Sequence, residues 1–180
     1  MKTRLWATLT ANGSYAQASA DQPPRPEALA DFAAHAAEAG NFIVGRRTFE
    51  AFLAQPTRAG DTPVATTEIV VVTSRPVDVP GVTSVTTPRA ALAHLAGRGH
   101  TLALLAGGEQ LHNAFLADDL VDELVLVVAP FIASRGLQLA MPPARYCELE
   151  LRSARTLGAG LVQLRYQRGQ VPGSYPPVID

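Results

Sequence analysis

The sequence predicts one α/β domain over residues 1–180, with a mixed, mostly parallel central sheet, helices on both faces and an antiparallel hairpin at the C-terminal end. Short apolar runs alternate with helical periodicities along residues 1–130, which is typical of parallel strands joined by helices. Two strictly alternating segments joined by Gly158-Ala159-Gly160 then predict the hairpin. A length of 180 residues is enough for one well-packed core.

The composition excludes several classes of protein. With 17% charged residues, 47% hydrophobic residues and a net charge of -1, neither disorder nor a nucleic-acid-binding surface is indicated. Cys147 is the single cysteine, so an internal disulfide and a cysteine-based metal cage are excluded. The four histidines have no metal-ligand spacing, and no apolar run reaches membrane-spanning length. We therefore expect a soluble cytoplasmic protein with no metal, nucleic-acid or membrane partner.

The first half of the chain opens with a strand and an Asn-Gly turn at Asn12-Gly13. A proline-containing surface loop at 18–26 precedes an amphipathic helix, which Gly40 ends. A buried strand then runs through Gly45 into a second helix. The expected elements are strands at 4–9 and 41–44 and helices at 27–39 and 46–53.

The second half begins after a polar connection at 55–67. Pro88 in a first turn and Gly97 as a stop delimit one helix, and a second helix follows Gly107-Gly108. The tail at 171–180 contains three prolines, so we expect it to be irregular and to pack against another subunit. The expected elements are helices at 88–96 and 109–118 and strands at 68–73, 82–86, 102–105, 121–130, 147–156 and 161–166.

Gly107-Gly108 is the most informative turn. It joins the apolar run 102–105 to a helix with Leu111, Phe115 and Leu116 on one face. Two residues without Cβ let a ligand approach the main chain and leave the first helical N–H groups available, which suits a phosphate. The alternative is a tight connection with no ligand, because a short glycine motif is a weak signal.

A second strand-to-helix turn places Arg46, Arg47 and Thr48 directly after Gly45. Cations beside the positive end of a helix dipole are unfavourable unless an anion binds there. The alternative is that the arginines pair with carboxylates on neighbouring elements. Ser74 and Arg75 follow a β-branched strand, at the sheet edge where open α/β sheets bind ligands.

This ordered set of motifs resembles the dihydrofolate-reductase-like superfamily, and most closely the C-terminal reductase domain of the riboflavin-biosynthesis deaminase-reductase. Residues 107–111 (Gly-Gly-Glu-Gln-Leu) and 120–124 (Leu-Val-Asp-Glu-Leu), followed by Ala129-Pro130, resemble its signature half. Residues 10–16 resemble its Ser-Leu-Asp-Gly-x-Ile-Ala motif. The resemblance implies a dihydrofolate-reductase-like three-layer fold.

The resemblance also implies a function and a cofactor. The function is an NADPH-dependent reductase acting on a pyrimidine ribosylamine such as 5-amino-6-(5-phosphoribosylamino)uracil. NADPH is expected over NADH because guanidinium groups select a 2′-phosphate. The implied cofactor-binding residues are Gly45, Arg46, Arg47 and Thr48 at the phosphates, Ser74 and Arg75 at the 2′-phosphate, and Gly107, Gly108, Glu109 and Gln110 at the pyrophosphate and nicotinamide. The partners expected are a small heterocyclic substrate and a second copy in a homodimer.

The departures from the family pattern concern the substrate. Asn12 replaces the family's aspartate, Ser14 stands where riboflavin enzymes often have lysine, and Ala106 replaces an acidic residue. No catalytic residue is assigned; the substrate-side candidates are Asn12, Glu27 and Asp31. Two alternatives therefore stay open: a dihydrofolate or other pterin reductase, and a non-catalytic nucleotide-binding relative of the same fold.

Four further side chains have two interpretations each. His112, early in the helix after the glycine pair, lies beside the expected cofactor and is a candidate site residue, although a helix-face position is the simpler assignment. Tyr15, Trp6 and Phe49 either stack on a heterocycle or fill the core.

Overall fold

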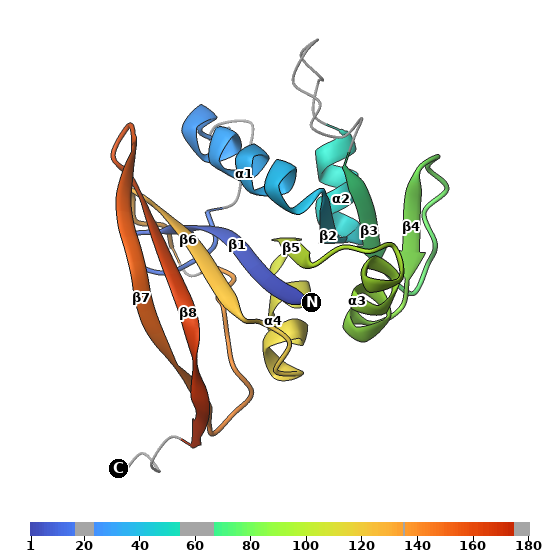
Figure 1. The fold of residues 1–180 in the computed structure, drawn as a ribbon. Coiled ribbons are helices and arrows are strands. Elements are labelled where there is room, and N and C mark those ends of the chain that lie inside the picture. The colour runs from blue at the N-terminus through green and yellow to red at the C-terminus, as the bar shows by residue number, and fades with distance from the viewer. Residues whose placement is uncertain (17–23, 55–66, 135, 175–180) are drawn as a thin grey trace.

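The computed structural model describes residues 1–16, 24–54, 67–134 and 136–174. Within these ranges eight strands form one sheet in the order β4-β3-β2-β5-β1-β6-β8-β7 (Figure 1). The strands are β1 (Lys2–Thr10), β2 (Asn41–Gly45), β3 (Glu68–Val72), β4 (Val82–Val85), β5 (Leu102–Gly107), β6 (Glu123–Ala129), β7 (Arg145–Gly158) and β8 (Leu161–Ser174). The helices are α1 (Pro26–Ala39), α2 (Arg46–Leu53), α3 (Pro88–Gly97) and α4 (Glu109–Ala117).

The strand directions confirm the predicted fold class. From β4 to β6 each neighbouring pair of strands is parallel, whereas β8 runs antiparallel to both β6 and β7. Helices α1 and α2 cover one face of the sheet, and α3 and α4 cover the other (Figure 1). The result is a three-layer domain that ends in an antiparallel hairpin.

Two apolar clusters hold the layers together, one on each face of the sheet. Leu5 and Leu105 pack with Phe115 of α4 on one face, and Val44 and Leu104 pack with Phe49 of α2 on the other. All six side chains are buried, because neighbouring residues of a strand point to opposite faces and both faces are covered. The continuous apolar runs in the sequence reflect this burial on both sides.

Strands β1 and β5 separate at their carboxyl ends. Their ladder runs from Lys2↔Leu102 to Leu5↔Leu105, whereas β1 stays paired with β6 as far as Thr10↔Ala129. The chain after β1 folds back along it, with the Ala16 N–H donating to the Thr8 carbonyl. Because β1 continues into α1 on one face and β5 into α4 on the other, this is a switch point of the sheet, where α/β proteins bind ligands.

The C-terminal tail differs from the prediction. Strand β8 extends to Ser174, so the expectation of irregular structure is wrong for residues 171–174. The reason is that β7 begins at Arg145 and pairs with that segment, from Arg145↔Ser174 onwards. The remainder of the predicted tail, 175–180, lies outside the described residues, as do most of the predicted loop at 18–26 and of the connection at 55–67. No helix in the described part of the chain is long and apolar enough to cross a membrane.

Candidate functional site

Three predicted turns lie side by side at the carboxyl edge of the sheet. Strands β3, β2 and β5 are consecutive neighbours, and their carboxyl ends lead into residues 73–75, 45–48 and 107–109 respectively. Gly45 precedes α2, and Gly108 precedes α4. Neither cap position makes a side-chain hydrogen bond to its helix, so the first N–H groups of both helices lack the usual capping acceptor.

The glycines of two of these turns pack against each other, and at Gly108 the packing leaves no room for a Cβ. A Cβ on Gly45 would lie 3.8 Å from both the Gly107 carbonyl oxygen and the Gly108 nitrogen. A Cβ on Gly108 would lie 2.8 Å from Oγ1 of Thr48, closer than van der Waals contact allows. Gly107 has φ +117° and its peptide bond to Gly108 is cis. The start of α2 therefore packs directly on the glycine pair.

The three arginines expected at the cofactor have different surroundings. The Arg46 guanidinium donates to Glu50 Oε1 at 2.6 Å, one turn along the same helix. The alternative given for the arginines was pairing with carboxylates on neighbouring elements, but the carboxylate that pairs with Arg46 lies on the same helix. Arg47 and Arg75 are exposed, and within the described ranges neither forms an ion pair. Arg75 lies in a turn that Thr73 holds, since the Thr73 hydroxyl accepts from the Arg75 N–H at 3.0 Å.

The start of α4 carries a carboxylate. Glu109 is its first residue and accepts a hydrogen bond from Asn113 Nδ2 at 3.2 Å. A carboxylate there already has the favourable interaction with the helix dipole that a phosphate would have. Anion binding is therefore favoured at the start of α2 and at the turn after β3. Gln110 and Ser74 are exposed beside these turns.

Two of the three substrate-side candidates are engaged elsewhere in the fold. The Asn12 amide donates to the Ala133 carbonyl at 2.9 Å, and its oxygen accepts from the Thr10 hydroxyl at 2.7 Å. Glu27 packs on the β7–β8 turn, where a Cβ on Gly158 would lie 3.6 Å from its Cγ. A substrate contact for either residue stays a prediction.

Asp31, the third candidate, is a buried carboxylate that accepts three hydrogen bonds. Its Oδ2 accepts from Trp6 Nε1 at 2.9 Å, and its Oδ1 accepts from Gln163 Nε2 at 2.6 Å and from Arg155 Nη2 at 2.7 Å. The carboxylate thus joins α1 to β1, β8 and β7. It also fixes the plane of the Trp6 indole.

The Trp6 ring forms part of an apolar cavity of about 120 Å³ beside the glycine pair. The cavity lies between the sheet and the two helices α1 and α2. Its aromatic walls are Trp6, Phe32, Phe42, Phe49 and Phe52. The rest of its described lining is Leu29, Val44, Thr48 and Ala106. Ala106 immediately precedes Gly107, and Thr48 packs on Gly108, so the cavity adjoins the predicted cofactor site.

Sequence reasoning named some of these lining residues but did not assemble them. Trp6 and Phe49 were expected either to stack on a ligand or to fill the core, and they do line a cavity. Phe32, Phe42 and Phe52 were missed as cavity residues. The sequence does contain a pattern that indicates this wall. Leu29 with Phe32 and Phe49 with Phe52 are three residues apart, so each pair shares a helix face.

His112 of α4 packs against Gly107 of the glycine pair. A Cβ on Gly107 would be 3.8 Å from His112 Cε1, and the imidazole is fully buried. Burial lowers the pKa of His112 to about 4, against a smaller opposing effect of the Leu105 carbonyl. The ring is therefore neutral near pH 7.

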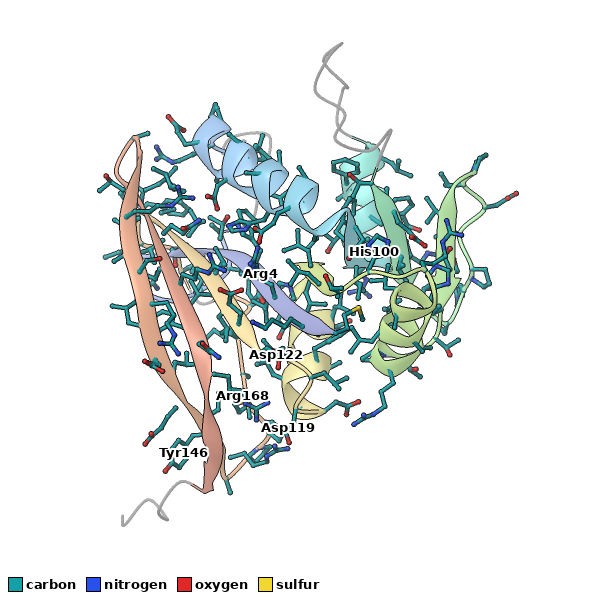
Figure 2. The ribbon with its side chains drawn as sticks, viewed as in Figure 1. Arg4, His100, Asp119, Asp122, Tyr146 and Arg168 are labelled. Carbon is teal, nitrogen blue, oxygen red and sulfur yellow. The ribbon has the colours of Figure 1, made fainter. Side chains whose placement is uncertain are left out.

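A separate group of charged residues lies away from the carboxyl edge. Arg4 is buried on β1 next to α1 (Figure 2), where it bonds Glu38 at 2.6 Å and Glu123 at 2.7 Å. These contacts join α1, β1 and β6, so we interpret them as structural. Across the described ranges, His, Cys, Asp and Glu side chains form no group of three or more that could hold a metal ion.

Solved structures share this fold. A putative riboflavin biosynthesis protein from Shewanella sp. PV-4 is 20% identical with a TM-score of 0.72, over 94% of this chain and 100% of that chain. A pyrimidine reductase-like protein from Corynebacterium diphtheriae is 15% identical with a TM-score of 0.73, over 94% of this chain and 92% of the other. RibD from Acinetobacter baumannii is 21% identical with a TM-score of 0.74, and the match covers 94% of this chain but 58% of RibD.

Sequence comparisons give the family. The uncharacterized protein YwjB of Bacillus subtilis is 33% identical over 64 residues, which are 36% of this chain and 36% of YwjB. The sequence model of the RibD C-terminal domain matches residues 5–163. That range includes the turns at 45–48, 73–75 and 107–110, so the match covers the same motifs from which the resemblance was drawn. The chain therefore belongs to the RibD C-terminal domain family.

Proposed function

We propose that this chain is an NADPH-dependent reductase that transfers a hydride to a small ring compound. The observation that carries the proposal is the contact between Gly45, Thr48, Gly107 and Gly108 at the sheet edge, with Arg75 following the neighbouring strand. These turns combine a glycine backbone, the N-terminus of α2 and guanidinium charge. That combination is suited to a phosphorylated dinucleotide.

The residues present fit this cofactor. The glycine pair at 107–108 brings the start of α2 against the start of α4, because Thr48 occupies the place that a Cβ on Gly108 would take. Arg47 and Arg75 supply positive charge for the 2′-phosphate and pyrophosphate. When bound, NADPH supplies the hydride, and the protein's role is to position it against the substrate and to exclude water.

Family membership makes 5-amino-6-(5-phosphoribosylamino)uracil the first substrate to test and dihydrofolate the second. Asn12, Ser14 and Ala106 replace the charged residues that would bind a ribosyl phosphate or a pyrimidine in the family. The Asp31 carboxylate, a substrate-side candidate, already accepts hydrogen bonds from Trp6, Arg155 and Gln163, so it has less capacity left for a ring compound. The non-catalytic alternative therefore has physical support and is included in the test.

The test has two stages. In the first, the fluorescence of NADPH is followed as protein is added, with Arg89→Ala as a matched control because Arg89 is an exposed arginine on α3. We expect saturable binding by the wild type and the control. An unchanged signal at saturating protein would reject the reductase. In the second stage, the loss of dihydronicotinamide absorbance is measured with each substrate. Binding without oxidation of any ring compound offered would favour the non-catalytic alternative.

The homodimer expected from the resemblance stays a prediction. Light scattering of the purified chain at micromolar concentration would measure its mass directly. A measured mass equal to that of one chain would contradict the homodimer.

A further inference from the structure

We infer that Tyr15 and His112 form a positioning pair: the hydrogen bond between them holds the segment 12–16 against the glycine turn at 107–108, and so sets the spacing between the carboxyl ends of β1 and β5. The inference rests on the proposed function only where it assigns a dinucleotide and a ring substrate to these two strand ends. The bond and its effect on the free protein do not depend on either ligand.

The ladder between β1 and β5 stops short of the site. Its last pair is Leu5↔Leu105, although β1 runs on to Thr10 and β5 runs on to Gly107. Beyond that pair, side chains rather than the ladder must set how far apart the two strand ends lie.

The Tyr15–His112 hydrogen bond joins the two strand ends. Tyr15 packs on the apolar cluster beneath α4, and its hydroxyl lies 2.6 Å from Nδ1 of His112. Tyr15 is tied to β1 through its bridge to Leu9. His112 is tied to the glycine turn, because its N–H donates to the Gly108 carbonyl at 3.0 Å. Each partner of the bond is therefore anchored on a different side.

The imidazole also packs on the glycine turn directly. A Cβ on Gly107 would lie 3.8 Å from His112 Cε1 and 3.9 Å from Thr48 Cγ2, so Gly107 lies between the imidazole and the start of α2. His112 is fully buried. A rotation of its ring would therefore displace the turn or lose this packing.

The segment that carries Tyr15 has other contacts, but these reach a different part of the fold. The Asn12 amide donates to the Ala133 carbonyl at 2.9 Å, and the Tyr15 N–H donates to the Leu137 carbonyl at 2.8 Å. Both acceptors lie in the chain that follows β6. Removing the Tyr15 hydroxyl should thus free the segment from α4 while leaving it attached on the β6 side.

The protonation states give the bond a direction. Burial, and then the charge of Glu109, raise the pKa of the Tyr15 hydroxyl, and burial lowers the pKa of His112 to about 4. Near pH 7 the tyrosine therefore donates to Nδ1, and the neutral imidazole carries its proton on Nε2. Within the described ranges that Nε2 has no hydrogen-bond partner of good geometry.

This unpartnered nitrogen indicates that stability alone does not account for the pair. A buried polar atom without a partner disfavours folding, whereas two apolar side chains of similar shape in place of the pair would be close to neutral. Departures of this kind from the most stable choice are expected at functional sites. A role in holding the glycine turn accounts for a tyrosine and a histidine at these positions.

Amide hydrogen exchange of the free protein, followed by mass spectrometry, tests the pair. Tyr15→Phe removes only the hydroxyl and should raise exchange in peptides covering 8–16 and 105–113 by roughly 2- to 10-fold. His112→Leu should do the same, whereas His112→Asn keeps an acceptor near the position of Nδ1 and should stay closer to the wild type. Tyr166→Phe is the matched control, because Tyr166 is half-buried on β8. Wild-type exchange in both Tyr15→Phe and His112→Leu would overturn the inference.

A double variant separates positioning from stability. Tyr15→Phe combined with His112→Leu removes both polar partners, so its melting temperature should stay close to that of the wild type. Exchange in both peptides should nevertheless remain raised, and NADPH should bind roughly 3- to 10-fold more weakly. A double variant with wild-type exchange and wild-type NADPH affinity would show that the pair only fills the core.

Failure here and failure of the proposed function are distinguishable. If NADPH does not bind the wild type, the reductase is wrong, and exchange in the free protein still decides the role of the pair. If NADPH binds the wild type and the variants alike and exchange is unchanged, the positioning pair is wrong while the reductase stands.

Discussion

The hydroxyl of Tyr15 lies 2.6 Å from Nδ1 of His112. Tyr15 belongs to the segment that folds back along β1, and His112 lies in the first turns of α4. Burial, and then the charge of Glu109, raise the pKa of the Tyr15 hydroxyl, so it keeps its proton and donates to the neutral ring. The pair joins the two sides of the gap between β1 and β5, and therefore holds the glycine pair in a defined position relative to the substrate side.

The buried His112 predicts a loss of stability in acid. Its pKa is lowered to about 4 in the folded protein from 6.5 in the unfolded chain, mainly by burial. The unfolded state therefore takes up a proton between pH 6.5 and 4 that the folded state does not, and the free energy of unfolding falls as pH decreases through that window. One pKa unit is worth about 1.4 kcal/mol, so the contribution of His112 is about 3 kcal/mol.

Urea unfolding at a series of pH values measures this effect. We expect His112→Leu to flatten the dependence between pH 6.5 and 4, and Tyr15→Phe, which keeps the imidazole buried, to retain it. An equally steep loss in His112→Leu would show that other groups cause the acid dependence.

A Gly108→Ala substitution should destabilise the protein through one contact. The added Cβ would lie 2.8 Å from Oγ1 of Thr48, and overpacking of this kind costs about 1–3 kcal/mol. Thr48→Ala removes the opposing atom, so the double variant should regain most of the loss. The melting temperatures of the two single variants and the double variant measure this coupling. Simple additivity of the two substitutions would contradict the predicted contact.

The arginines should contribute unequally to cofactor preference. Arg47→Ala or Arg75→Ala should weaken NADPH binding by roughly 10- to 100-fold and NADH binding less, since hydrogen bonds to charged groups contribute about 1.5–3 kcal/mol. Arg46→Ala should have a smaller effect, because that guanidinium is already bonded to Glu50. Dissociation constants for both dinucleotides test this. The same NADPH-to-NADH ratio in all three variants as in the wild type would refute the predicted 2′-phosphate site.

Asp31→Asn should reduce stability with little effect on NADPH binding. The carboxylate is buried and accepts from Trp6, Arg155 and Gln163, and breaking such a network costs about 3–5 kcal/mol. Chemical denaturation measures the loss, and a shifted Trp6 emission spectrum would report the altered indole environment. Arg155→Ala is the comparison, and its effect should be smaller because that side chain is 57% exposed. Wild-type stability of Asp31→Asn would contradict a structural role.

Local sequence patterns predicted the individual helices and strands, but not every pairing between strands. The alternation in residues 147–166 predicted the hairpin, because the period of a strand is visible in a few neighbouring residues. The strand status of residues 171–174 was missed, because it depends on pairing with residues 145–147, more than 20 positions away. Prolines in the tail favoured an irregular structure locally, and the ladder with β7 outweighed them.

The sequence by itself determined the parallel α/β sheet, the glycine turns at Gly45 and Gly107-Gly108, and the family, since periodicity and turn chemistry are local properties. Tertiary structure alone decided which side chains meet. It turned Asp31 toward Gln163, 132 positions away, joined Tyr15 to His112 across 97 positions, and gathered five aromatic rings from β1, α1, β2 and α2 into one cavity. Contacts over such separations depend on strand order and helix placement, so no local pattern contains them.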